Sequence, residues 1–78
     1  MIFYSTPGSI TWGKNENQCV TFQGEWTLEP KFYLDLPKEI YWNNTHPPKR
    51  LSEFEIQEAI KSLMADSIAK GWIIEVQR

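Results

Sequence analysis

Residues 51–71 read LSEFEIQEAIKSLMADSIAKG, and this stretch contains a helix start, a helix body and a helix stop. The hydroxyl of Ser52 is placed to accept a hydrogen bond from the first turn. The Glu55 side chain, three residues on, can accept one from the Ser52 amide. Gly71 supplies the left-handed residue that ends a helix. These signals predict a helix over roughly residues 53–70.

The body of the predicted helix carries a broad apolar half, with Ser67 near its middle at about 100° per residue. Other parts of the chain must cover this half, because so short a helix cannot bury such a stripe alone. Phe54 lies on the flank, where it is either a core-edge residue packed against a loop or an exposed aromatic available to a partner. The apolar residues of this half are Ile56, Ala59, Ile60, Leu63, Met64 and Ile68.

Short runs of alternating polar and apolar residues precede the helix and indicate strands with one buried face. Ile10 and Trp12 are the inner residues of one run, and Phe32 and Leu34 are inner residues of another. Residues 40–42 fit either a last strand or a helical turn. The expected strands cover residues 2–5, 9–12, 18–22, 25–28 and 32–36 before the helix, with a bend at residues 23–24, and residues 72–77 after it.

The order of these elements indicates a fold class. A strand that follows a helix after a single glycine folds back under that helix, which places it in the sheet that the helix covers. The sequence therefore predicts an α+β fold. We expect a mostly antiparallel sheet of about five to six short strands, one long helix packed on one face, and a C-terminal strand.

Length and charge limit the classes of function. Seventy-eight residues make a single domain spanning residues 1–78, since single cores usually account for roughly 50 to 200 residues. Eight basic and ten acidic residues give a net charge of −2, which offers no general attraction for nucleic acid or an anionic membrane and suits a basic partner better. The first residues, MIFYSTPG, contain no signal peptide or membrane span, which predicts a cytoplasmic protein.

Residue types that carry chemistry in enzymes are sparse in this sequence. Cys19 is the only cysteine, which excludes a disulfide within the chain and a cysteine-built zinc site. His46 is the only histidine, and it lies in a proline-rich loop without a nucleophile motif. No residues are spaced for a metal site, and no glycine-rich phosphate loop is present. We therefore expect a protein that is not an enzyme, that needs no cofactor or metal, and that works through its surface.

Five residues are candidates for a partner-binding surface. Tyr33 and Asp35 alternate away from the apolar residues of their strand, and Glu39 follows a few residues later. Tyr41 and Trp42 are adjacent rings that cannot both face one core if the chain is extended. Aromatic anchors and carboxylates together would suit a cationic cleft on a partner. The alternative is a solvated sheet face beside a stiff loop.

The order of several short motifs resembles that of a known family. The sequence contains Phe32-Tyr33-Leu34-Asp35, then Ile40 and Trp42, the pair Pro47-Pro48, a capped helix closed by Lys70-Gly71, and the run from Trp72 to Val76. From about residue 9 onward, this order resembles the small bacterial immunity proteins of polymorphic toxin systems, in particular the family called immunity protein seventy-four. The resemblance implies a partner in contact-dependent growth inhibition: a cognate toxin domain, often a nuclease with a cationic cleft, which the protein binds and neutralises stoichiometrically.

A second class of function fits the same features. The chain could be a small structural or adaptor domain without catalytic activity, forming a homodimer that pairs edge strands or exposed rings. A third class, a small enzyme, has the least support. Gene neighbourhood separates the first two classes, because a large secreted protein with a variable C-terminal domain encoded immediately upstream favours the immunity function.

Overall fold

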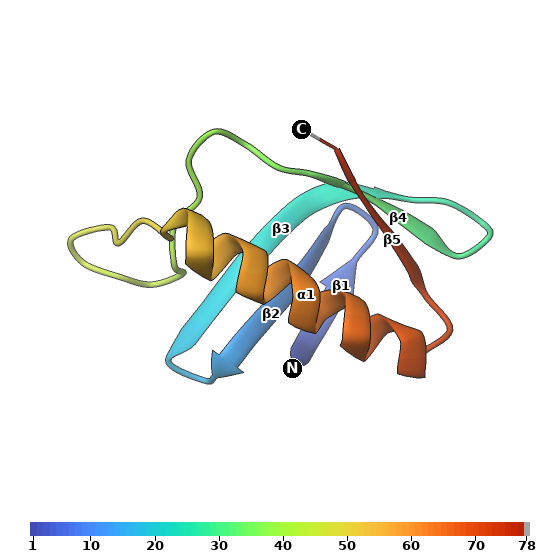
Figure 1. Ribbon diagram of the computed structural model, residues 1–78, viewed down its shortest axis with the longest axis horizontal. Coiled ribbons are helices and arrows are strands. Elements are labelled where there is room, and N and C mark those ends of the chain that lie inside the picture. The colour runs from blue at the N-terminus through green and yellow to red at the C-terminus, as the bar shows by residue number, and fades with distance from the viewer. Residues whose placement is uncertain (78) are drawn as a thin grey trace.

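A computed structural model describes residues 1–77, and in it a single helix lies across one face of a five-stranded sheet (Figure 1). The elements are β1 (Ile2–Thr6), β2 (Ser9–Asn15), β3 (Gln18–Trp26), β4 (Lys31–Asp35), α1 (Glu53–Ala69) and β5 (Ile73–Gln77). The strands are hydrogen-bonded in the order β1-β2-β3-β4-β5. The first four form an antiparallel meander, and β5 runs parallel to β4 after a crossover through α1. The α+β fold expected from the sequence is confirmed.

The start and stop signals of α1 work as the sequence predicts. The Ser52 hydroxyl accepts a hydrogen bond from the Glu55 amide at 3.1 Å, and the Glu55 carboxylate accepts one from the Ser52 amide at 2.9 Å. Leu51 and Ile56 flank this cap and are both buried, as a hydrophobic staple requires. Gly71 has a φ of 75°, the left-handed conformation that ends the helix. Within residues 1–77, no helix is long and apolar enough to cross a membrane.

The core lies between α1 and one face of the sheet. From the helix, small residues at the contact allow close approach: Ala59 is 1% exposed, and Ser67 donates its hydroxyl to the Leu63 carbonyl at 2.7 Å. Trp26 and Trp72 close one end of the core with ring centroids 4.9 Å apart. The apolar residues of the core are Ile10, Trp12, Val20, Phe22, Phe32, Leu34, Ile40, Trp42, Leu51, Ile56, Ala59 and Leu63.

The buried arc of α1 is narrower than the apolar stripe predicts. Met64 is 38% exposed and Ile68 is 77% exposed, so their assignment to the covered face is wrong. At about 100° per residue, Ile68 lies about 140° around the helix from Leu63, beyond the contact that the sheet makes. Phe54 is 73% exposed and belongs to the outer side of the helix, not to the core edge.

The third strand is longer than expected. The predicted bend at residues 23–24 is absent, because β3 continues through Gly24 and pairs with both β2 and β4. A Cβ atom added at Gly24 would meet the Tyr33 carbonyl oxygen and lie 2.7 Å from the Phe32 ring. The glycine therefore allows close packing within a continuous strand. Leu28, expected at the end of a separate strand, lies fully exposed in the β3–β4 turn.

Residues 40–51 form a lobe that folds back on itself beside β3. Tyr41 forms an antiparallel bridge with Arg50, the Trp42 amide donates to the Lys49 carbonyl at 2.9 Å, and residues 40–42 are therefore extended and not a helical turn. The Asn43 amide donates to the Cys19 carbonyl at 2.7 Å, so the lobe occupies the edge of β3 that β4 leaves unpaired. The lobe projects from the sheet near the start of α1 (Figure 1).

Candidate partner-binding surface

The outer side of β3, β4 and β5, turned away from α1, carries two parallel rows of polar side chains. Along β4, Phe32 and Leu34 are buried, so the alternation of a strand turns Tyr33 and Asp35 to the opposite face. The strand register then gives each of them one neighbour on each side. The rows are Glu25, Tyr33 and Glu75, and beside them Gln23, Asp35 and Gln77; these six residues are called the acidic face below.

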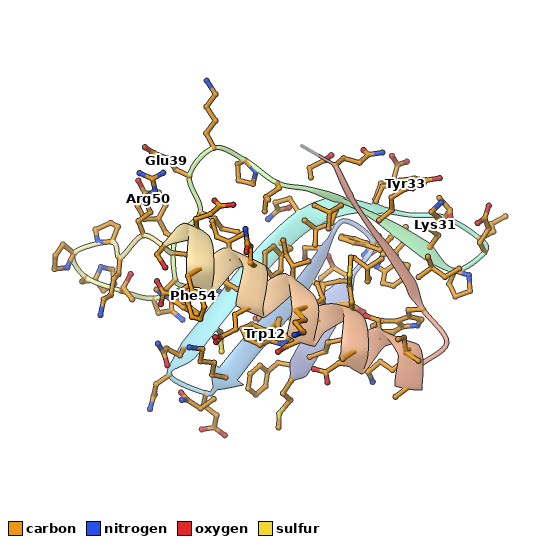
Figure 2. The ribbon with its side chains drawn as sticks, viewed as in Figure 1. Trp12, Lys31, Tyr33, Glu39, Arg50 and Phe54 are labelled. Carbon is orange, nitrogen blue, oxygen red and sulfur yellow. The ribbon has the colours of Figure 1, made fainter. Side chains whose placement is uncertain are left out.

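Tyr33 lies at the centre of its row and is half-buried. The Lys31 ammonium lies 4.9 Å from the Tyr33 ring centroid and 3.5 Å from a Glu75 carboxylate oxygen, and Figure 2 shows Lys31 and Tyr33 as neighbours on β4. Partial desolvation acts to lower the pKa of Lys31, but the Tyr33 side chain and the Glu75 carboxylate together raise it above its ordinary value. This contact pairs Glu75 with a cation and places the ammonium over one face of the tyrosine ring.

The other two carboxylates of the acidic face have no such partner. Within residues 1–77, neither Glu25 nor Asp35 makes an ion pair. Both side chains are exposed on strands whose backbone is held on both sides by ladder hydrogen bonds. The acidic face therefore presents two uncompensated negative charges beside the ring of Tyr33, Glu25 across on β3 and Asp35 two residues along β4.

Glu39 and Tyr41 lie on a different part of the surface. The Tyr41 hydroxyl donates to a Glu39 carboxylate oxygen at 2.9 Å, and this contact raises the pKa of Tyr41 above its ordinary value. An Arg50 guanidinium nitrogen lies 3.9 Å from the other Glu39 oxygen. Figure 2 shows Glu39 and Arg50 at one end of the molecule and Tyr33 towards the other. The five sequence candidates thus do not form one surface, since Glu39 directly precedes the lobe, Tyr41 lies in it, and both are already partnered there.

Trp42 is not available to a partner. It is 4% exposed and packs in the core together with Ile40 and Leu51. Its assignment to a binding surface is wrong because the extended lobe turns alternate residues inward, which buries Trp42 and leaves Tyr41 outside. Of the two adjacent rings, the smaller and more polar one faces solvent.

Four residues of the acidic face escape prediction from the sequence. Gln23 and Glu25 come from β3 and Glu75 and Gln77 from β5, two separate segments of the chain, and only the strand register brings them beside β4. A partial signal does exist, because Glu75 alternates with Ile74 and Val76 in the terminal strand. That alternation predicts an outward carboxylate but not which strand lies next to it.

Two further features of the described residues bear on chemistry. A surface hollow of about 460 Å³ lies near β1, β2 and the lobe and includes Cys19, whose thiol donates to the Asn15 carbonyl at 3.2 Å. No group of three or more histidine, cysteine or acidic side chains in residues 1–77 is arranged to hold a metal ion. His46 is exposed on the lobe.

Comparison of the chain with protein-family models, with curated proteins and with solved structures finds no match. The likeness to the immunity proteins therefore stays a prediction from the motif order.

Proposed function

We propose that this protein binds a basic protein partner through the acidic face and blocks it stoichiometrically, as an immunity protein does to its cognate toxin. The observation that carries the proposal is that Tyr33 has two unpaired carboxylates beside it, Glu25 directly across on β3 and Asp35 two residues along β4, on a sheet face turned away from the helix. The resemblance of the motif order to immunity proteins supports the same partner class.

The chemistry of the acidic face suits a protein partner with a cationic cleft. Negative charges at the rim accelerate encounter with a positive surface and set the orientation of docking. A tyrosine at the centre supplies a large contact area with few rotatable bonds, which is typical of residues that dominate binding energy. Because β4 is hydrogen-bonded on both sides, these groups lose little conformational freedom on binding.

A toxin whose substrate is a nucleic acid is the partner that these charges fit best. Such an enzyme needs a positively charged cleft to hold phosphates. An inhibitor that places carboxylates over that cleft competes with the substrate for the same electrostatic attraction. A protein that blocks a nuclease in this way needs no catalytic group of its own.

The test is to co-express the protein with the C-terminal domain of a secreted protein encoded next to it, and to measure binding by calorimetry. Tyr33→Ala and Asp35→Asn should each weaken the complex about thirtyfold or more, as loss of a central aromatic or a desolvated carboxylate typically does. Glu39→Gln is the matched control and should leave the affinity unchanged, because this carboxylate directly precedes the lobe and lies outside the acidic face.

Two results would refute this function. One is a purified pair that forms no complex although both proteins are folded. The other is a complex in which Tyr33→Ala, Asp35→Asn and Glu25→Gln all bind as tightly as the parent. In a true complex through the acidic face, the association rate should also fall as salt is raised from about 20 mM to 300 mM, because ions screen the attraction.

The alternative function, a homodimeric adaptor, has one observation in its favour. Phe54 and Ile68 are 73% and 77% exposed and lie on the outer side of α1, away from the acidic face. Exposed apolar residues of this kind can cover one another in a symmetric pair. Light scattering over a range of protein concentrations separates the two functions: dimerisation that Phe54→Ser abolishes favours the adaptor, and a monomer at all concentrations rejects it.

A further inference from the structure

A shallow hollow of about 400 Å³ opens at the Asp35 end of the acidic face. Its polar lining is one of the two cross-strand rows, in which Asp35 lies between Gln23 on β3 and Gln77 on β5. Its apolar lining is Leu36 and Pro37, the residues that directly follow β4. The Leu36 amide donates to the Gln77 carbonyl at 2.9 Å, which holds this end of β4 against β5.

The hydrogen-bonding capacity of this hollow is unused. The Asp35 carboxylate makes no ion pair or hydrogen bond within residues 1–77, and neither does the side-chain amide of Gln23 or Gln77. A carboxylate offers two acceptor oxygens, and each glutamine amide adds one carbonyl acceptor. Acceptors of both kinds thus converge beside an apolar wall.

We propose that this hollow receives an arginine side chain of the basic partner, an inference that rests on the proposed function. The planar guanidinium carries five N–H donors and pairs with a carboxylate through two parallel hydrogen bonds. The donors left over can reach the amide oxygens of Gln23 and Gln77, which lie on either side of Asp35. The methylene stem of the arginine can pack on Leu36 and Pro37.

Other occupants fit the hollow less well. A lysine ammonium has only three donors, so it forms hydrogen bonds with fewer of the acceptors. It is also more strongly hydrated, so it loses more hydration free energy on leaving water. An anion is repelled by Asp35. A metal ion needs several ligating side chains, and no such group exists in residues 1–77.

Asp35 is also the carboxylate best placed for this role. Glu75 is paired with Lys31 at 3.5 Å, and Glu39 is held by Tyr41 and Arg50. Glu25 is unpaired but does not line this hollow. Among these four carboxylates, Asp35 alone combines an unpaired charge with a concave site and flanking acceptors.

The test is an NMR titration of the ¹⁵N-labelled protein with N-acetyl-arginine amide, at low salt and neutral pH. Saturable shifts are expected at the backbone amides of Asp35 and Leu36 and at the side-chain amides of Gln23 and Gln77. N-acetyl-lysine amide should bind at least about fivefold more weakly, because it lacks the planar fork. The citrulline analogue, which has the shape of arginine without its charge, should cause no saturable shift.

Two variants make the titration decisive. Asp35→Asn keeps the size of the side chain and should weaken arginine binding at least about tenfold. Glu39→Gln removes a carboxylate charge outside the acidic face and should leave binding within about twofold. Equal shifts with the lysine probe, or arginine shifts that persist in Asp35→Asn, overturn the proposal. The dispersion of the spectrum confirms that each variant is folded.

The arginine site in this hollow, called the subsite here, and the proposed function can fail separately. Arginine binding at Asp35 without any complex with the neighbouring toxin domain rejects the function and keeps the subsite. A complex that depends on Tyr33 but tolerates Asp35→Asn keeps the function and rejects the subsite.

Discussion

The two faces of one sheet differ sharply although the same strands build both. On the face under α1, Phe32 and Leu34 are fully buried, whereas on the opposite face their neighbours Tyr33 and Asp35 are half-buried and exposed. Burial of apolar area supplies most of the folding free energy, at about 25 cal/mol per Å². Exposed polar residues contribute little to stability, so the outer face can be used for binding without cost to the fold.

This difference holds where β3, β4 and β5 lie side by side but not where β3 pairs with β2. There the outer face carries a covered polar layer, in which the Thr11 and Thr21 hydroxyls are 3.0 Å apart and the Asn43 amide donates to Thr21 at 2.8 Å. Thr11 is only 3% exposed. The lobe thus covers part of the outer face where β2 pairs with β3 and leaves the part formed by β4 and β5 open.

The largest expected effect comes from a substitution in the core between α1 and the sheet. Leu63→Ala should lower the free energy of unfolding by about 2 to 5 kcal/mol, because this side chain is fully buried at the centre of the helix contact. Urea denaturation measures this loss of unfolding free energy. Met64→Ala is the neighbouring control and should cost clearly less, since Met64 is 38% exposed. Equal losses in the two variants would contradict the buried arc described for α1.

The next largest effect is expected from a substitution at Gly24 on β3. Gly24→Ala should cost about 1 to 3 kcal/mol, because the added methyl group meets the Tyr33 carbonyl and the Phe32 ring. Gly8→Ala is the control, since a Cβ there would make only an ordinary contact, 3.8 Å from the Gly24 carbonyl oxygen. Thermal unfolding of both variants measures the difference in stability between them. A Gly24→Ala protein as stable as the parent would show that β3 is not packed as described.

The helix and the inner faces of the strands are predictable from the sequence because local signals specify them. The capping box of Ser52 and the alternation of Phe32 and Leu34 need no knowledge of distant residues. Trp42 and Ile68 are assigned wrongly because their burial depends on how far a neighbouring element reaches. The acidic face is largely unpredictable, since it is assembled by pairing between segments far apart in the chain.

A smaller effect is expected at the start of α1, outside both faces. Ser52→Ala should cost about 0.5 to 2 kcal/mol by removing the hydroxyl that caps the first turn. The hydrogen bond from the Ser52 amide lowers the pKa of Glu55 below its ordinary 4.5, although partial desolvation opposes this. The charged form of Glu55 therefore stabilises the fold above about pH 4.5, and this contribution is lost as the pH falls through the lowered pKa. Glu55→Gln should flatten the loss of stability in that acidic range, and an unchanged pH profile would contradict the capping role.

The smallest effect is expected on the acidic face itself, where Glu25→Gln and Asp35→Asn should each change stability by less than about 0.5 kcal/mol. Neither carboxylate has an ion-pair partner in residues 1–77, so neutralising it removes no attraction. Glu25 and Glu75 lie two strands apart, about 10 Å, at which distance like charges still repel weakly at low salt. Both variants should therefore be neutral or slightly stabilising in urea denaturation at pH 7. A loss of more than about 1 kcal/mol in either would mean that these carboxylates hold the fold together, and the contrast between a stabilising face and a face free for binding would fail.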